Sequence, residues 1–111
     1  MNIDEIKKDK TLVITPEGRL DQIAAQSFQQ KVINSIEKGE SSILIDFSKI
    51  SYISSAGLRT LLIIAKRQKD SDGLFAICSL TDSVNQVFKA SGFNTIVDIY
   101  PDQKSALDKL I

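Results

Sequence analysis

The 111-residue sequence predicts one α/β domain, with a largely parallel, mixed β-sheet and about four helices. Apolar runs rich in β-branched residues alternate along the chain with segments whose apolar residues recur every three or four positions. An N-terminal hairpin precedes this alternation, so the expected order is ββαβαβαβα. Apolar residues make up 42% of the chain, which is enough to build one core over residues 1–111.

The hairpin is expected to join a short edge strand at residues 3–8 to a stronger strand at residues 11–15. Residues 9–10 would form the turn between them. Pro16 is expected to end the regular pairing because proline has no N–H group to donate.

Asp21 is a candidate N-cap for the first helix, and Gly39 is a natural residue to end it. The apolar residues of this helix fall on one face and are Ala24, Phe28, Val32 and Ile36.

Residues 42–66 are the central segment of the chain, a buried strand at 43–47 followed by a helix. One face of that helix is expected to carry Leu58, Leu61, Leu62 and Ala65. Small residues at 54–57 join the strand to the helix, and Gly57 is expected to supply conformational freedom there. A serine in this turn can cap the helix, and the positive helix end also favours a phosphate.

A second buried strand is expected at 74–78, followed by a helix that starts within 79–82 and ends at Gly92. A last strand within 93–99 and a terminal helix from 101 complete the pattern. We expect a single core formed by Ile43, Leu44, Ile45, Phe47, Leu58, Leu61, Leu62, Phe75, Ile77, Val87 and Phe88.

Composition argues against several classes of site. The chain has no histidine and one cysteine, Cys78, which excludes a Cys/His zinc cluster, a Ser-His-Asp triad and an intrachain disulfide. No glycine-rich phosphate loop is present, so we expect no cofactor, no metal and no catalysis. Fourteen basic residues balance fourteen acidic ones, which gives no general attraction to nucleic acid. There is no secretion signal or membrane-length apolar run, so a cytoplasmic protein is expected.

The sequence resembles the bacterial anti-sigma factor antagonists of the STAS domain family over essentially its whole length. The most specific match is the junction, where residues 45–47 read IDF and residues 52–58 read YISSAGL. Supporting matches are EGRLD at 17–21, VF at 87–88 and SGF at 91–93.

The resemblance implies a phosphorylation switch, with Ser55 at the position of the family's phosphorylated serine. Members of the family bind an anti-sigma factor, which is a serine kinase of the GHKL ATPase class, and so release its sigma factor. The kinase phosphorylates the serine, the complex dissociates, and a metal-dependent serine phosphatase reverses the modification.

Two positions depart from the family pattern. Ser54 stands where an aspartate is common, which makes it the alternative phosphoacceptor, and Ala56 stands where a serine or threonine is usual. The partner-binding residues implied by the resemblance are Gly18, Arg19, Asp21, Ser54, Ser55, Ala56, Gly57 and Leu58.

Purely structural roles compete with these assignments. Ser55 and Asp21 could be simple helix caps, Asp46 a turn-forming carboxylate and Cys78 a buried small hydrophobe. The basic cluster of Lys66, Arg67 and Lys69 is more typical of a solvated helix end than of a nucleic-acid site.

Two other functions compete with a phosphorylation-switched antagonist. One is an unphosphorylated STAS interaction module of a sensory complex. The other is a regulator that binds a small molecule or nucleotide at the carboxyl ends of its strands.

Overall fold

The computed structural model describes residues 1–110, which form a mixed sheet and four α-helices, as the sequence predicted. The sheet has six strands, one more than expected. The strands are β1 (Asn2–Lys8), β2 (Thr11–Leu20), β3 (Ser42–Asp46), β4 (Ile50–Ile53), β5 (Leu74–Cys78) and β6 (Asp98–Tyr100). The helices are α1 (Gln22–Glu37), α2 (Ser55–Asp70), α3 (Asp82–Ser91) and α4 (Gln103–Lys109), with a 3₁₀ turn, η1 (Phe93–Thr95).

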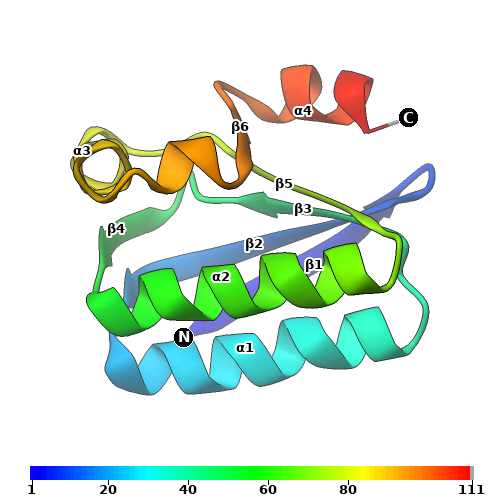
Figure 1. Cartoon of the computed structure of the whole chain (residues 1–111), viewed down its shortest axis with the longest axis horizontal. Coiled ribbons are helices and arrows are strands. Elements are labelled where there is room, and N and C mark those ends of the chain that lie inside the picture. Colours follow the sequence, from blue (N-terminus) through cyan, green and yellow to red (C-terminus); the bar gives the residue numbers. More distant parts are fainter. Residues whose placement is uncertain (111) are drawn as a thin grey trace.

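The sheet runs in the order β1-β2-β3-β5-β6. Strand β1 is antiparallel to β2, and the other pairings are parallel. Helices α1 and α2 lie side by side on one face, α4 lies on the other face, and α3 lies at one end (Figure 1). No helix in the described part of the chain is long and apolar enough to span a membrane.

Strand β4 is an element that sequence reasoning missed. It pairs with β2 at Gly18–Leu20, beyond the point where β3 pairs with Leu12–Ile14. Its four residues are buried only at the two ends, so they lack the alternation that identifies a strand.

Strand β2 is also longer than predicted, because it continues through Pro16 to Leu20. Pro16 lies between the part of β2 that pairs with β3 and the part that pairs with β4. No parallel partner therefore requires an N–H group from Pro16, and the proline does not end the strand.

The last strand begins later than expected. Residues 93–95 form the 3₁₀ turn η1, Ile96 is in the helical region and 62% exposed, and β6 starts at Asp98. Gly92, in a left-handed conformation, ends α3 as predicted. The 3₁₀ turn that follows contains residues that we expected to belong to the last strand. Tertiary structure here overrides the β-propensity of Ile96.

The apolar interior consists of two clusters and not the single core expected. The larger cluster lies between the sheet and helices α1, α2 and α3, and contains Phe28, Phe47, Leu61 and Phe88. The smaller one lies under α4 and contains Val13, Leu44, Ala76, Cys78, Ala106 and Leu110. Leu44 joins the smaller cluster because successive residues of a strand point to opposite faces.

The buried face of helix α2 differs from the face that the sequence predicted. Leu61 and Ile64 are fully buried, whereas Leu62 is 38% exposed and the prediction that it lies in the core is wrong. Leu58, Phe75 and Val87 are only partly buried and pack against the larger cluster.

Candidate functional site

The two motifs singled out in the sequence meet at one end of the sheet, where α1 and α2 both begin (Figure 1). Strand β4 ends beside β2, with Ile53 opposite Leu20, so that Asp21 and Ser54 are the next residues on each side. The N–H of Ser54 donates to the carbonyl of Leu20 over 3.0 Å. Pairing of β4 with β2 therefore brings residues 18–21 and 54–58 together.

Ser54 is the N-cap of α2, which corrects the alternative that Ser55 is the cap. Its hydroxyl accepts from the N–H of Gly57 and donates to the carbonyl of Leu20, each over 3.1 Å. An aspartate here, as is common in the family, could accept the first bond but not donate the second. Ser54 thus keeps the capping function and adds a link to β2.

Ser55 is the first residue of α2, and its side chain is exposed. The bonds that organise the turn use Ser54, whose carbonyl accepts from the N–H of Leu58. Within residues 1–110 no hydrogen bond engages the Ser55 hydroxyl. The N–H groups of Ser55 and Ala56 have no partner within the helix, since the first turn of any helix leaves them free.

Gly57 is required for a steric reason and not for the conformational freedom that we expected. A Cβ atom at this position would lie 2.8 Å from the Leu20 carbonyl oxygen and 2.8 Å from Cγ1 of Ile53. Glycine therefore allows the first turn of α2 to contact the ends of β2 and β4.

The residues before α1 form the other half of the site. Gly18 has a φ of +114° where the β2–β4 register shifts, and its N–H donates to the Lys49 carbonyl over 2.9 Å. Arg19 lies 4.2 Å from the ring centroid of Tyr52, a cation–π contact. Asp21 is the N-cap of α1, as expected, and accepts from the N–H of Ala24 over 2.9 Å.

Ile23 and Tyr52 are exposed beside these residues and were not singled out by the sequence analysis. Ile23 is 82% exposed, and Tyr52 is 40% exposed. Ile23 lines a shallow hollow of about 530 Å³ with Gly18, Arg19 and Asp21. An isoleucine outside the apolar face of α1 is the signal that could have identified it. The serine surface is defined here as Arg19, Asp21, Ile23, Tyr52, Ser55 and Ala56.

Gly57 and Leu58, although part of the implied set, support the serine surface from below, since Gly57 is buried and Leu58 packs against the larger core.

Asp46 and Cys78 have structural roles, as the simpler interpretations held. Asp46 is 6% exposed, and its carboxylate accepts from the Ser48 N–H over 2.9 Å and from Gln103 Nε2 over 2.7 Å. Burial raises the pKa of the Cys78 thiol to about 11, so the thiol stays protonated near neutral pH. The residues described contain no group of His, Cys, Asp and Glu side chains that could hold a metal ion.

The C-terminal end of α2 carries the basic cluster, which is exposed as a solvated helix end should be. Arg67 pairs with Glu37 over 2.7 Å, and Lys66 pairs with Asp70 over 3.7 Å.

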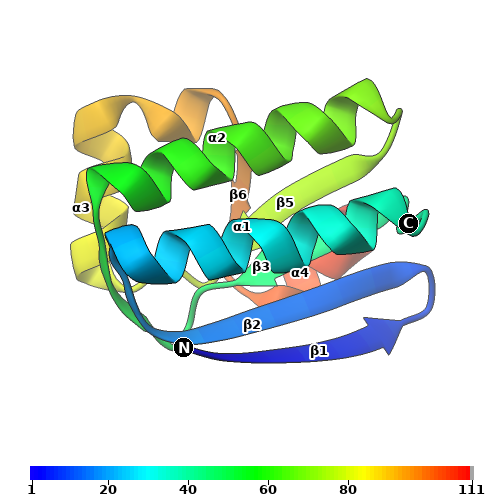
Figure 2. The same ribbon diagram turned by 90° about the horizontal axis from the view of Figure 1, so that it is seen from below.

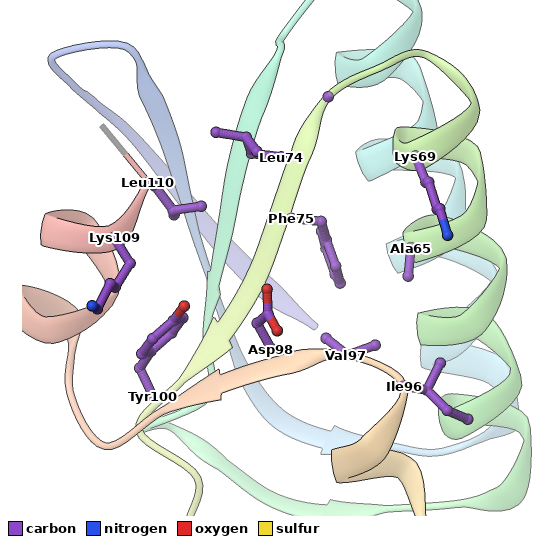
Figure 3. A pocket seen from close by; sticks show the side chains of 11 residues that line it. Ala65, Lys69, Leu74, Phe75, Ile96, Val97, Asp98, Tyr100, Lys109 and Leu110 are labelled. Atoms are coloured by element: carbon purple, nitrogen blue, oxygen red, sulfur yellow. The ribbon is translucent and has the colours of Figure 1, made fainter.

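A second cavity lies away from the serine surface, between α2, β5, β6 and α4 (Figure 3). Its volume is about 260 Å³, and Lys69, Phe75, Asp98 and Tyr100 are among the residues that line it. None of the residues implied by the family resemblance lies in it.

Known proteins resemble this chain in sequence and in fold. The STAS domain model matches residues 2–106. BtrV of Bordetella bronchiseptica, described as a candidate anti-sigma factor antagonist, is 30% identical over 106 residues, which cover 96% of this chain and 91% of BtrV. A solved structure of a candidate antagonist from Thermotoga maritima is 25% identical, with a TM-score of 0.93, and covers 97% of this chain and 93% of that one. Bacillus SpoIIAA in its phosphorylated form shares the fold at 20% identity and a TM-score of 0.75, over 99% and 100% of the two chains.

Proposed function

This chain belongs to the STAS domain family, and we propose that it is an anti-sigma factor antagonist whose binding is switched off by phosphorylation of Ser55. The observation that carries the proposal is the exposed Ser55 hydroxyl at the start of a 16-residue helix, beside the motif at residues 18–21. The relatives described as anti-sigma factor antagonists, and the existence of a phosphorylated form of SpoIIAA, support this assignment.

The geometry favours Ser55 over Ser54 as the phosphoacceptor. A kinase must reach the hydroxyl oxygen and remove its proton, and Ser54 is half-buried with that oxygen bonded to Leu20 and Gly57. Phosphorylating Ser54 would break the cap of α2, whereas the Ser55 hydroxyl is exposed. Ala56 offers no competing hydroxyl.

A phosphate on Ser55 would be accommodated by the fold. It adds about −1.5 to −2 charges near neutral pH, at the positive end of the helix dipole and beside free N–H groups. The first turn of α2 contains no acidic residue to repel it. Arg59 lies four residues further on and is exposed, so it can approach the phosphate along the same helix face.

The partner would lose affinity because the phosphate would lie within the surface that the partner covers. Ile23 and Tyr52 supply exposed apolar area of the kind that anchors interfaces, and Arg19 and Asp21 supply polar contacts. Packing a partner against this surface would require removing water from a doubly charged group.

We assign the partner as an anti-sigma factor that is also a serine kinase of the GHKL type, with a metal-dependent phosphatase restoring the unmodified form. The protein then acts in the cytoplasm by binding and performs no catalysis itself.

The test uses the full chain as bait in an extract of its native cells. Three forms are compared: the unmodified chain, the chain with phosphoserine incorporated at position 55, and a control with phosphoserine at position 41. Ser41 is exposed just before β3, at the other end of α2 from Ser55. Unmodified and position-41 baits should capture one GHKL-type kinase identified by mass spectrometry, and the position-55 bait should not.

The captured kinase is then incubated with ATP and two variants. Phosphate transfer should persist on Ser54→Ala and disappear on Ser55→Ala. Transfer that disappears only with Ser54→Ala would select the alternative serine. Equal capture by the unmodified and position-55 baits would rule out the switch and favour an unphosphorylated interaction module.

A further inference from the structure

Strand β1 leaves one edge of the sheet open. It is the first strand in the sheet order and pairs only with β2, on its inner side. Figure 2 shows it as the outermost strand, with neither α1 nor α2 covering its outer edge. The seven residues of β1 are exposed apart from Ile3. A strand edge of this length can pair with a strand from another chain.

The side chains of β1 are ordered so that the strand is complementary to itself. Residues 4–8 read Asp, Glu, Ile, Lys, Lys, with the acidic pair before the isoleucine and the basic pair after it. Charges on an edge strand normally discourage pairing with other chains. Here an antiparallel copy would place the acidic half of one strand against the basic half of the other.

Symmetry restricts the registers that are available. The residues whose N–H and C=O groups point outward alternate along β1, and opposite residues of an antiparallel pair must both point outward or both inward. Opposite residues of two identical strands are therefore both even-numbered or both odd-numbered. Each register is then defined by the sum of the two residue numbers, which is even. A sum of 12 places Ile6 opposite Ile6, Glu5 opposite Lys7 and Asp4 opposite Lys8. A sum of 10 would place Glu5 opposite itself, and a sum of 14 would do the same to Lys7. Only the first register matches every charge.

The faces of the sheet also agree with this register. Ile6 lies opposite Val13, which belongs to the cluster under α4, and Ile6 itself is 57% exposed. In the dimer the two Ile6 side chains would cover each other. Glu5 and Lys7 point to the other face, where Lys7 already pairs with Glu40, so Glu5 of a second copy would extend that ion pair.

From these observations we propose that a second copy of this chain pairs with the outer edge of β1, in antiparallel register about Ile6, to form a symmetric dimer with one continuous sheet. The two-fold axis passes through Ile6, and the N-terminal end of β1 lies beside β2 near the serine surface, with Asn2 opposite Glu17. The dimer would therefore present its two serine surfaces at opposite ends. The interface is short, so we expect the dimer to dissociate on dilution.

Sedimentation of the full chain over a concentration series tests the pairing. Asp4→Lys should weaken the dimer about tenfold, because it replaces two symmetry-related attractions by repulsions. Exchanging the charges, Asp4→Lys with Lys8→Asp, should restore the affinity to within about twofold of the original. Ile96→Lys is the matched control, because Ile96 is as exposed as Ile6 but lies just before β6, at the sheet edge opposite β1, and it should leave association unchanged.

Cysteine crosslinking tests the register independently. Ile6→Cys should form a disulfide-linked dimer rapidly, because opposite residues in this register lie within disulfide reach. Lys8→Cys should not, because two copies of residue 8 would be offset by four residues, about 13 Å along the strands. A mixture of Asp4→Cys and Lys8→Cys should give the mixed dimer, and buried Cys78 should not compete.

The proposal is overturned if the chain stays monomeric up to millimolar concentration, or if Asp4→Lys associates as tightly as the original. It is also overturned if Ile6→Cys crosslinks no faster than Lys8→Cys.

Discussion

At the scale of single residues, three small residues around the first turn of α2 have different structural roles. Ser54 caps the helix, the Ser55 hydroxyl is exposed, and Gly57 fits against β2 and β4. Neighbouring residues of similar size thus differ in what a substitution would change: the fold at Ser54 and Gly57, and the surface at Ser55.

Gly57→Ala should lower the free energy of unfolding by about 1–3 kcal/mol, since the added methyl group meets backbone and buried side chains. The Leu20 carbonyl and Ile53 cannot both move away without disturbing the pairing of β2 with β4. Urea denaturation measures the change. Ser55→Ala is the control in the same turn, and it should stay within about 0.5 kcal/mol of the original. A Gly57→Ala protein as stable as this control would show that the turn is looser than described.

Cys78 should make the fold sensitive to alkaline pH. Burial raises the pKa of its thiol from the ordinary 9.0 to about 11, so the unfolded state loses the proton first. The stabilisation is complete below pH 9.0 and decreases as the pH rises toward 11. Denaturation midpoints should therefore fall more steeply between about pH 9 and 11 for the original protein than for Cys78→Ala. Parallel slopes would mean that the folded thiol titrates like an exposed one.

At the scale of elements, α2 connects the serine surface to the core. Its buried residues Leu61 and Ile64 fix the helix against the sheet, and Gln68 near its C-terminus donates to the carbonyls of Glu40 and Leu74. The position of Ser55 therefore depends on packing along the whole helix.

Two adjacent leucines provide a matched test of that packing. Leu61→Ala should cost about 2–5 kcal/mol of unfolding free energy, because it removes a fully buried side chain. Leu62→Ala should cost less than about 1 kcal/mol, since Leu62 is 38% exposed. Chemical denaturation of both variants gives the comparison. Equal losses would place both leucines in the core and contradict the observation that Leu62 lies outside it.

At the scale of the whole molecule, the proposed phosphorylation site lies at one end of the sheet, and the proposed dimer edge runs along its side. Phosphate at Ser55 should therefore change the local surface and not the fold.

Phosphoserine incorporated at position 55 should leave the free energy of unfolding within about 1 kcal/mol of the original, because the helix dipole favours the added charge. Amide chemical-shift changes in NMR spectra should be confined to residues 18–24 and 52–59. The unmodified chain is the reference, and phosphoserine at position 41 controls for charge alone. Shift changes that reach α4 would indicate a conformational switch through the sheet.

Much of the fold follows from local patterns. The hairpin, the four helices and the caps at Asp21 and Gly92 were predictable because hydrophobic period and capping chemistry are local properties. The family resemblance identified Ser55 as the candidate site. The apolar run before Ser55 and the helical periodicity after it predicted that this serine lies at the start of a helix.

The tertiary structure decided the features that depend on contacts between distant segments. Strand β4 exists because β2 continues past Pro16 and provides an edge, which four residues of mixed polarity cannot indicate. The same pairing brings the Leu20 carbonyl within reach of the Ser54 hydroxyl, which also caps α2 by accepting from the N–H of Gly57. The sequence by itself therefore determined the helices and the longer strands, and only their packing determined strand β4 and which of two adjacent serines is exposed.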